Sequence, residues 1–338
     1  MSRPRLLRVL SALLALCPLL CAGCAPRPEP AKTTFAAMDT VMTLTVYGGE
    51  ADALSAARDR VLELEARLSV TDPDSEIAAL NREGTAALSP DTAELLSRSL
   101  ELCARTGGAL DVTIYPVVRA WGFTTGDYAV PDRDTLSALL EKVDYTKVRL
   151  EGNAASLPAG AELDLGAVAK GYAGDELAAL LREKGVESAL LELGGNIHTI
   201  GSKPDGSDWR VAVRDPADPE GYLGVVSVSG KAVVTSGGYE RYFEEGGVRY
   251  WHIMDPASGA PARSGLASVT VAADSGLYAD ALSTALFVMG REKALDYWRT
   301  HRDFEAILVS EDGSVTVTEG LEKSFTLSGA RTLSVARP

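Results

Sequence analysis

Apolar residues recur along much of the chain at the spacing of an amphipathic helix. Within residues 50–68, five of them follow one another at intervals of three or four: Leu54, Ala57, Val61, Leu64 and Leu68. This spacing places them on one face of a helix, which would be buried against the rest of the protein. We predict further helices over residues 90–105, 132–143, 166–184 and 292–301.

Strands are predicted where apolar and polar residues alternate, as at Met42, Leu44 and Val46. Turn residues predict two hairpins, around residues 151–153 and 311–313, and a pair of strands joined at Gly194 and Gly195. Three more strands are predicted over residues 209–213, 224–228 and 232–235. Together these elements favour a mixed α/β (α+β) fold with largely antiparallel sheets, arranged in two lobes.

Composition narrows the class of protein. The 338 residues carry a formal net charge of −14. The first 23 residues hold three arginines and no acid, so the remaining 315 carry −17. We therefore exclude nucleic-acid binding, which needs basic patches. Only Cys103 lies in the body of the chain, so the folded part cannot form a disulfide with itself.

The N-terminus has the pattern of an export signal. Residues 1–23 combine a basic start with an apolar run, and small residues precede Cys24. The sequence CAGC resembles a bacterial lipoprotein cleavage box, although Cys21 stands where leucine is usual. We predict a signal peptide over residues 1–23, lipidation of Cys24, a tether over residues 24–34 and a folded domain over residues 35–330. Ordinary secretion is the alternative. The expected location is the periplasm or the outer face of the cytoplasmic membrane, with the lipid as anchor.

Residues 231–290 hold the densest group of candidate site residues. A helix is expected to begin with Asp280, and Ser283 and Thr284 share its polar side. A carboxylate and two hydroxyls within one turn suit a hard cation such as Mg²⁺. Free N–H groups at a helix start also favour a bound phosphate. The alternative is ordinary helix capping, for which these residue types are common.

Five motifs resemble those of the ApbE family of flavin transferases. They are DLGAVAKGYAGD (164–175), ELGGN (192–196), TSGGYERY (235–242), HIMDPASGAP (252–261) and ADALSTALFVMG (279–290). The resemblance runs from about Met38 to about Val309. It implies an ApbE-like domain with a flavin-binding groove between the lobes, FAD as substrate and Mg²⁺ as cofactor.

The resemblance also implies roles for individual residues. Those implied to contact the flavin or FAD are Met38, Thr71, Trp121, Gly122, Phe123, Asp164, Lys170 and Met254. Those implied to hold the metal are Asp280, Ser283, Thr284 and the Ala167 carbonyl. Many members carry aspartate at the Ser283 position, so a weaker or water-mediated contact is expected from this neutral serine.

His252 is the candidate catalytic base because histidine exchanges protons near neutral pH. Alternation places it on one face of a strand with Tyr250 and Met254. The residues alone leave purely structural roles open as alternatives. These are a core histidine at 252, strand-edge packing for Met38, a core pair for Trp121 and Phe123, a capping role for Asp164 and a solvated Lys170.

The expected reaction is Mg²⁺-dependent transfer of FMN from FAD to a Ser/Thr hydroxyl of a target protein, releasing AMP. The resemblance implies an acceptor that is a membrane redox subunit with a flavinylation motif. One alternative is an FAD pyrophosphatase, in which water attacks instead of the hydroxyl. Another is a flavin-binding lipoprotein without chemistry, which would have no need of a metal beside a base.

Overall fold

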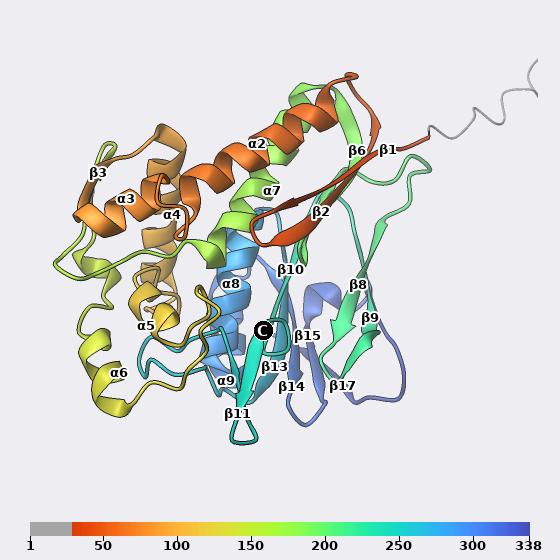
Figure 1. Ribbon diagram of the computed structural model, residues 1–338. Coiled ribbons are helices and arrows are strands. Elements are labelled where there is room, and N and C mark those ends of the chain that lie inside the picture. The colour runs from red at the N-terminus through yellow and green to blue at the C-terminus, as the bar shows by residue number, and fades with distance from the viewer. Residues whose placement is uncertain (1–28) are drawn as a thin grey trace, which may run out of the picture.

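A computed structural model describes residues 29–338, and its largest element is a nine-stranded sheet (Figure 1). Neighbouring strands pair antiparallel except for β15 and β17, which pair parallel. In spatial order they are β1 (Ala31–Ala37), β2 (Thr40–Gly48), β6 (Val186–Leu193), β7 (Asn196–Ile200), β10 (Ala232–Gly237), β13 (Leu266–Ala273), β14 (Glu305–Ser310), β15 (Val315–Thr318) and β17 (Leu333–Ala336). The predicted mixed α/β fold with largely antiparallel sheets is confirmed.

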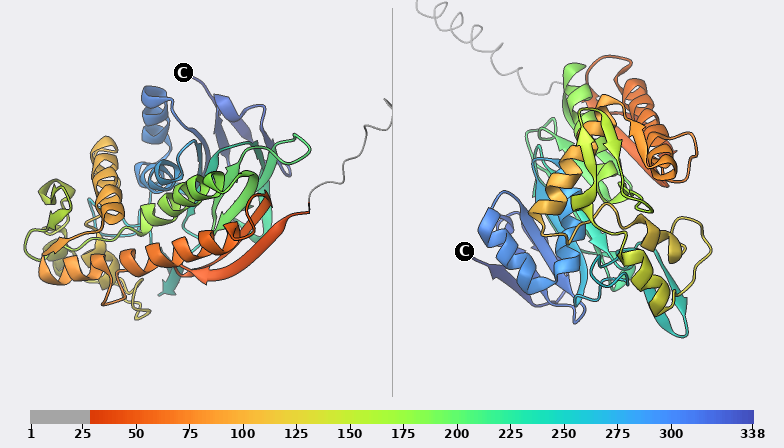
Figure 2. Two further views of the ribbon diagram at one scale, coloured as in Figure 1. Left: turned by 90° about the horizontal axis from the view of Figure 1, so that it is seen from above. Right: turned by 90° about the vertical axis from the view of Figure 1, so that its left-hand side faces the viewer.

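Helices cover one face of this sheet. They are α2 (Ala53–Leu68), α7 (Gly166–Glu183), α8 (Gly276–Met289) and α9 (Arg291–His301). Figure 2 shows α2 and α7 lying side by side. On β13, Val269 and Val271 pack toward α8, because alternate side chains of a strand point to the same face.

The opposite face of the sheet is buried under a small three-stranded sheet. That sheet has the order β16 (Phe325–Leu327), β9 (Asp218–Val228) and β8 (Trp209–Asp215). Ala272 of β13 and Val233 of β10 point toward it, opposite to their neighbours in the chain. The central strands are therefore buried on both faces, which explains why they read as nearly continuous apolar runs.

A mainly helical lobe lies on the left in Figure 1, beside α7 and α8. Its helices are α3 (Glu76–Glu83), α4 (Pro90–Arg105), α5 (Tyr115–Ala120) and α6 (Arg133–Leu140). Its small sheet has the order β3 (Thr85–Ala87), β5 (Ala154–Ser156) and β4 (Arg149–Glu151). Pro116 lies in the first turn of α5, where a missing N–H costs no helical hydrogen bond. The helix predicted over residues 90–105 and both predicted hairpins are confirmed.

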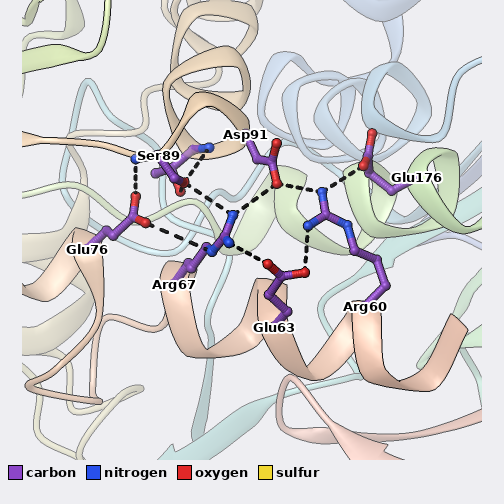
Figure 3. Close-up of polar contacts among 8 residues, drawn as sticks. Arg60, Glu63, Arg67, Glu76, Ser89, Asp91 and Glu176 are labelled. Carbon is purple, nitrogen blue, oxygen red and sulfur yellow. Dashed lines mark hydrogen bonds and ion pairs between the residues drawn. The ribbon is translucent and has the colours of Figure 1, made fainter. Parts of the chain in front are cut away.

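Arginines on α2 join the lobe to the helices on the sheet. Arg60 pairs with Asp91 of α4 at 2.6 Å and with Glu176 of α7 at 2.8 Å (Figure 3). Arg67 also pairs with Asp91, at 3.0 Å. Burial lowers the pKa of the Arg60 guanidinium, but the carboxylates of Glu176, Asp91 and Glu63 raise it by more. This network fixes α7 relative to α2 and α4.

The folded region is longer than predicted at both ends. β1 begins at Ala31, inside the predicted tether, and pairs with β2 along its whole length. Its sequence AKTTFAA lacks an apolar alternation because it is an edge strand with little burial. At the other end, β17 lies wholly beyond residue 330 and pairs with β15. The predicted signal peptide and the lipidation site Cys24 lie outside the described residues.

Two elements that carry candidate site residues start or end elsewhere than predicted. α8 begins at Gly276 and not at Asp280, with Ser275 as the N-cap. The hairpin strand β12 (Val248–Trp251), paired with β11 (Tyr242–Glu245), ends one residue before His252. His252 therefore does not share a strand face with Met254. The part of the chain that the structure describes also contains two short 3₁₀ turns, η2 (Tyr145–Lys147) and η3 (Glu319–Leu321).

Among residues 29–338, we find no helix with the length and apolar character that crossing a bilayer requires.

Candidate functional site

The candidate metal residues lie where α7 crosses α8. The Gly171 N–H of α7 donates to Oδ2 of Asp280 on α8 at 2.8 Å. A Cβ atom at position 171 would lie 2.6 Å from Cβ of Asp280 and would overlap the Gly276 carbonyl oxygen. Glycine is therefore required at this crossing because the two backbones approach closely. Asp280 is only 5% exposed.

This contact gives a first prediction. Replacing Gly171→Ala should destabilise the fold by about 1–3 kcal/mol or more, because the added methyl meets backbone and not a movable side chain. Urea unfolding of the variant measures the change. An unchanged midpoint would mean that α7 and α8 can separate without cost, contrary to the packing described.

The helix start does not offer a free phosphate site. The N–H groups of Gly276 and Leu277 donate to the carboxylate of Asp175 on α7, and that of Tyr278 donates to the hydroxyl of Ser275. The amides of the first turn thus already have protein acceptors. The expectation that a phosphate binds these amides is wrong.

Hydroxyl groups cluster one turn further along α8. Ser283 donates to the Asp280 carbonyl at 2.9 Å, and its oxygen lies 2.7 Å from that of Ser236 on β10. The Ser236 hydroxyl is also 3.3 Å from that of Thr284. Ser283 is 0% exposed whereas Thr284 is half-buried. Of the two predicted ligands, Thr284 is the more accessible one.

The surroundings of Asp280 act on its carboxyl group in opposite directions. Burial raises the pKa of this carboxyl group, while nearby Lys170, the Gly171 amide and the Asn196 side chain act in the opposite direction. A divalent cation beside the carboxylate would favour its charged form, so the residue chemistry fits a bound metal. Residues 29–338 hold no cluster of three or more His, Cys, Asp or Glu side chains suited to a metal. The predicted set differs in kind, because it has one carboxylate, two hydroxyls and a carbonyl.

Lys170 is a positive charge that influences three of the other candidate residues. Its ammonium group acts electrostatically on Asp164, His252 and Asp280. Asp164 accepts the N–H of Gly166, the first residue of α7, at 2.7 Å, as its capping alternative predicts. Burial raises the pKa of Asp164, and Arg241 and Lys170 oppose that rise. The structure thus brings together residues that lie more than 100 positions apart in the chain.

Arg241 is a member of this group that the sequence did not single out. It donates to the Phe123 carbonyl at 2.7 Å and acts electrostatically on both Asp164 and His252. It lies within the motif TSGGYERY, but its neighbours come from distant segments. With Lys170 it forms a pair of cations suited to an anionic substrate.

His252 is half-buried and electrically neutral near pH 7. Burial lowers its pKa to about 4, and the positive charges of Arg241 and Lys170 contribute to this. Its Nδ1 lies 3.2 Å from the Arg241 carbonyl oxygen. A carbonyl only accepts, so Nδ1 carries the proton and Nε2 keeps a free lone pair. This tautomer is the one that a general base on Nε2 requires.

The predicted flavin-contacting aromatic residues form a core of their own. Trp121 is 2% exposed and donates from Nε1 to the Gly259 carbonyl, and Phe123 is 3% exposed. Met254 is buried in the same cluster, while the Phe123 ring lies 6.3 Å from that of His252. These side chains pack as the core-pair alternative describes, and a flavin contact of Trp121, Gly122, Phe123 or Met254 stays a prediction. Gly122 adopts φ +82°, and a Cβ there would overlap the backbone of Asp127.

The remaining two candidates are attached to α2 and the loop after it. Met38 lies in the β1–β2 turn at φ 49°, and its N–H donates to Glu65 of α2 at 2.6 Å. The Met38 side chain is half-buried. The buried part packs as the strand-edge alternative predicts. Thr71 is exposed, and its hydroxyl lies 3.2 Å from that of Ser69. A flavin contact of either residue stays a prediction.

Two surface cavities lie apart from these residues. One of about 300 Å³ opens beside the first turn of α8, between Arg98, Arg105 and Tyr278. The other, of about 490 Å³, lies beside β9 of the sheet β16-β9-β8 and the end of α9, near Lys231 and Arg302. Neither is lined by a predicted site residue, so the flavin-binding groove between two lobes stays a prediction.

Known proteins resemble this chain over most of its length. The model of the ApbE family matches residues 38–308. The FAD:protein FMN transferase of Treponema pallidum (strain Nichols) is 35% identical over 323 residues, covering 90% of this chain and 85% of that protein. That of Klebsiella pneumoniae (strain 342) is 33% identical, covering 83% and 89%.

Solved structures agree. The flavinyl transferase ApbE of Pseudomonas stutzeri, in its apo form, superposes with a TM-score of 0.81 at 31% identity, covering 91% of this chain and all of that one. The ApbE protein of Thermotoga maritima gives a TM-score of 0.83 at 29% identity, covering 88% and 99%. On sequence and on fold alike, this chain belongs to the ApbE family.

Proposed function

We propose that this protein transfers FMN from FAD to a Ser/Thr hydroxyl of a target protein and releases AMP. Relatives named FAD:protein FMN transferase support the flavin substrate and the transfer. The observation that carries the chemistry is the convergence of Lys170, Arg241 and His252 beside Asp164 and Asp280. Cations for a diphosphate and a neutral base within one site suit phosphoryl transfer.

The proposed reaction exchanges one phosphorus–oxygen bond for another. The acceptor hydroxyl oxygen bonds to the phosphorus on the FMN side of the diphosphate. The bond from that phosphorus to the bridging oxygen breaks, and the electron pair leaves with AMP. The hydroxyl proton passes to Nε2 of His252 and from there to the departing phosphate or to solvent. No net oxidation or reduction occurs.

The chain's own residues contribute position and charge to this step. Arg241 is anchored by its hydrogen bond to Phe123, and Lys170 lies on α7 near three candidate residues. Both side chains would bind the diphosphate and hold it in line with the hydroxyl. His252 is kept in its Nδ1–H tautomer by the Arg241 carbonyl, so its lone pair is available without a change of state.

The residues that would hold Mg²⁺ are Asp280, Thr284 and the Ala167 carbonyl, as oxygen ligands of the kind this ion prefers. When bound, the ion would neutralise the charge that develops on the diphosphate. Ser283 has its hydroxyl engaged with Asp280 and Ser236, which favours a supporting role beside Thr284 over direct ligation.

The lowered pKa of His252 predicts an unusual pH dependence. Protonation removes the lone pair, so activity should be lost as pH falls through the pKa. In kcat/KM, which reports the free enzyme, this acid limb should lie near pH 4 and not near 6.5. In kcat it should lie higher, because the negative diphosphate of bound FAD stabilises the imidazolium. A limb in kcat/KM at 6.5 would contradict the described surroundings of the ring.

Water in place of the acceptor hydroxyl would give FAD hydrolysis in the same site. Following FMN and AMP release from FAD and Mg²⁺, with and without an acceptor, separates the two reactions. Transfer predicts that AMP appears in proportion to acceptor and that free FMN stays low. AMP and free FMN released at the same rate without acceptor would establish the hydrolase instead.

The proposed partner and location follow the same reasoning. The acceptor would be a membrane redox subunit, and the lipid on Cys24 would hold the enzyme at the outer face of the cytoplasmic membrane or in the periplasm. The basic start, the apolar run and the small residues before Cys24, which predict a signal peptide over residues 1–23, support this proposal. Cell fractionation with a Cys24→Ala variant tests it, because loss of the lipid should release the protein from the membrane fraction.

A further inference from the structure

Asp175 is the last residue of the motif DLGAVAKGYAGD, and the proposed chemistry gives it no role. Its carboxylate leaves α7 and accepts three hydrogen bonds from the start of α8. They come from the Gly276 N–H at 2.6 Å, the Ser275 hydroxyl at 2.7 Å and the Leu277 N–H at 3.0 Å. Asp175 therefore caps a helix that follows it by about a hundred residues.

One more hydrogen bond joins α7 and α8 one turn away from the three that Asp175 accepts. Gly171 and Asp175 are four residues apart on α7, and Gly276 and Asp280 are four residues apart on α8. Residues at this spacing share a helix face. Because Gly171 bonds Asp280 while Asp175 bonds Gly276, the helices run antiparallel and are fixed at two levels.

His198 of β7 closes the remaining space at this crossing. Its ring lies against Gly174 and Gly276, where any Cβ atom would overlap it. The side chain is 3% exposed, with Nδ1 3.9 Å from Oδ1 of Asp175. Within the described part of the chain, Nε2 has no hydrogen-bond partner. The His198 ring thus fills the space between α7 and α8 at this crossing.

We propose that Asp175 is a positioning residue for the metal site, setting the spacing between α7 and α8. This inference rests on the proposed function. The Ala167 carbonyl belongs to α7, whereas Asp280 and Thr284 belong to α8. An ion that binds all three needs the two helices at one register, because ligand distances for Mg²⁺ are nearly invariant. Asp175 fixes that register without touching the ion or the substrate.

The test is Asp175→Asn. The present carboxylate accepts at both oxygens, whereas an amide accepts at one and directs N–H groups at backbone donors with the other. We expect the dissociation constant for Mn²⁺, used as a spectroscopic substitute for Mg²⁺ and followed by electron paramagnetic resonance, to rise about 10- to 100-fold. The KM for FAD should change little by comparison.

The matched control is Asp132→Asn. Asp132 is the N-cap of its own helix, α6, and its carboxylate likewise accepts a backbone N–H and a hydroxyl hydrogen bond, from Thr135 at 2.8 Å and 2.9 Å. It should lose a similar amount of helix capping and keep wild-type Mn²⁺ affinity. Equal Mn²⁺ affinity in both variants would overturn the proposal.

Ser275→Ala is a milder second variant, for use if Asp175→Asn does not fold. It removes one of the three bonds to Asp175, so a smaller rise in the Mn²⁺ constant is expected, and an unchanged constant counts against the proposal. A wild-type protein that binds Mn²⁺ but transfers no FMN would refute the proposed function alone. Intact wild-type transfer with no effect of either Asp175→Asn or Ser275→Ala on Mn²⁺ affinity would refute the positioning role alone.

Discussion

His252→Ala is expected to slow FMN transfer by about 10²- to 10⁴-fold, the usual contribution of a positioned general base. The variant loses Nε2 of the ring. The lone pair of Nε2 is free because the proton is held on Nδ1 by the Arg241 carbonyl oxygen. FAD binding should persist, because the cations proposed for the diphosphate, Lys170 and Arg241, stay in place. The acid limb of the pH profile should disappear with the ring.

Single-turnover transfer and equilibrium FAD binding, measured on the same preparation, check this result. His301→Ala is the matched control, since its Nδ1 also lies near a backbone carbonyl, that of Tyr297 at 3.0 Å. His301 lies at the end of α9 and should be replaceable at full activity. Normal transfer by His252→Ala would show that another group takes the proton.

Asp280→Asn is expected to abolish the response to Mg²⁺ and to lower the rate by about 10³-fold, since metal charge stabilisation contributes several kcal/mol. The amide keeps the size of the side chain and can still accept the Gly171 N–H. The thermal midpoint should hold or rise, because the variant removes a buried charge that desolvation disfavours.

A Mg²⁺ titration of transfer rate, with thermal unfolding of the same samples, separates these effects. Asp111→Asn is the matched control because burial also raises the pKa of Asp111, whose carboxylate bonds Thr113 and Tyr145. That variant should keep the Mg²⁺ response. A wild-type titration curve for Asp280→Asn would remove this residue from the metal site.

The sequence predicted elements whose burial is one-sided. The helix over residues 90–105 and the hairpin at 311–313 appeared as expected, since periodicity and turn residues agree there. The start of α8 was missed because this helix is buried on nearly all sides, so no polar face marks its first turn. Ser275, which accepts the Tyr278 N–H, was the signal that could have placed it.

The sequence indicated which residues belong to the candidate site, but it did not indicate which of them contact one another. Asp175 and Arg241 both lie within motifs that the sequence displays, but their partners are a hundred or more positions distant. Local patterns do not encode such contacts. An aromatic pair beside a glycine, such as Trp121 and Phe123, gives the same pattern whether it contacts a ligand or packs in a core. Both side chains pack in a core cluster, and their contact with a flavin stays a prediction.

The most direct test of the account is mass spectrometry of an acceptor protein after incubation with this enzyme, FAD and Mg²⁺. If this protein transfers FMN, the acceptor gains the mass of FMN less one water on a single Ser or Thr, with one AMP released for each acceptor modified. An acceptor of unchanged mass, in a reaction where FAD is nevertheless converted to free FMN and AMP, would contradict it.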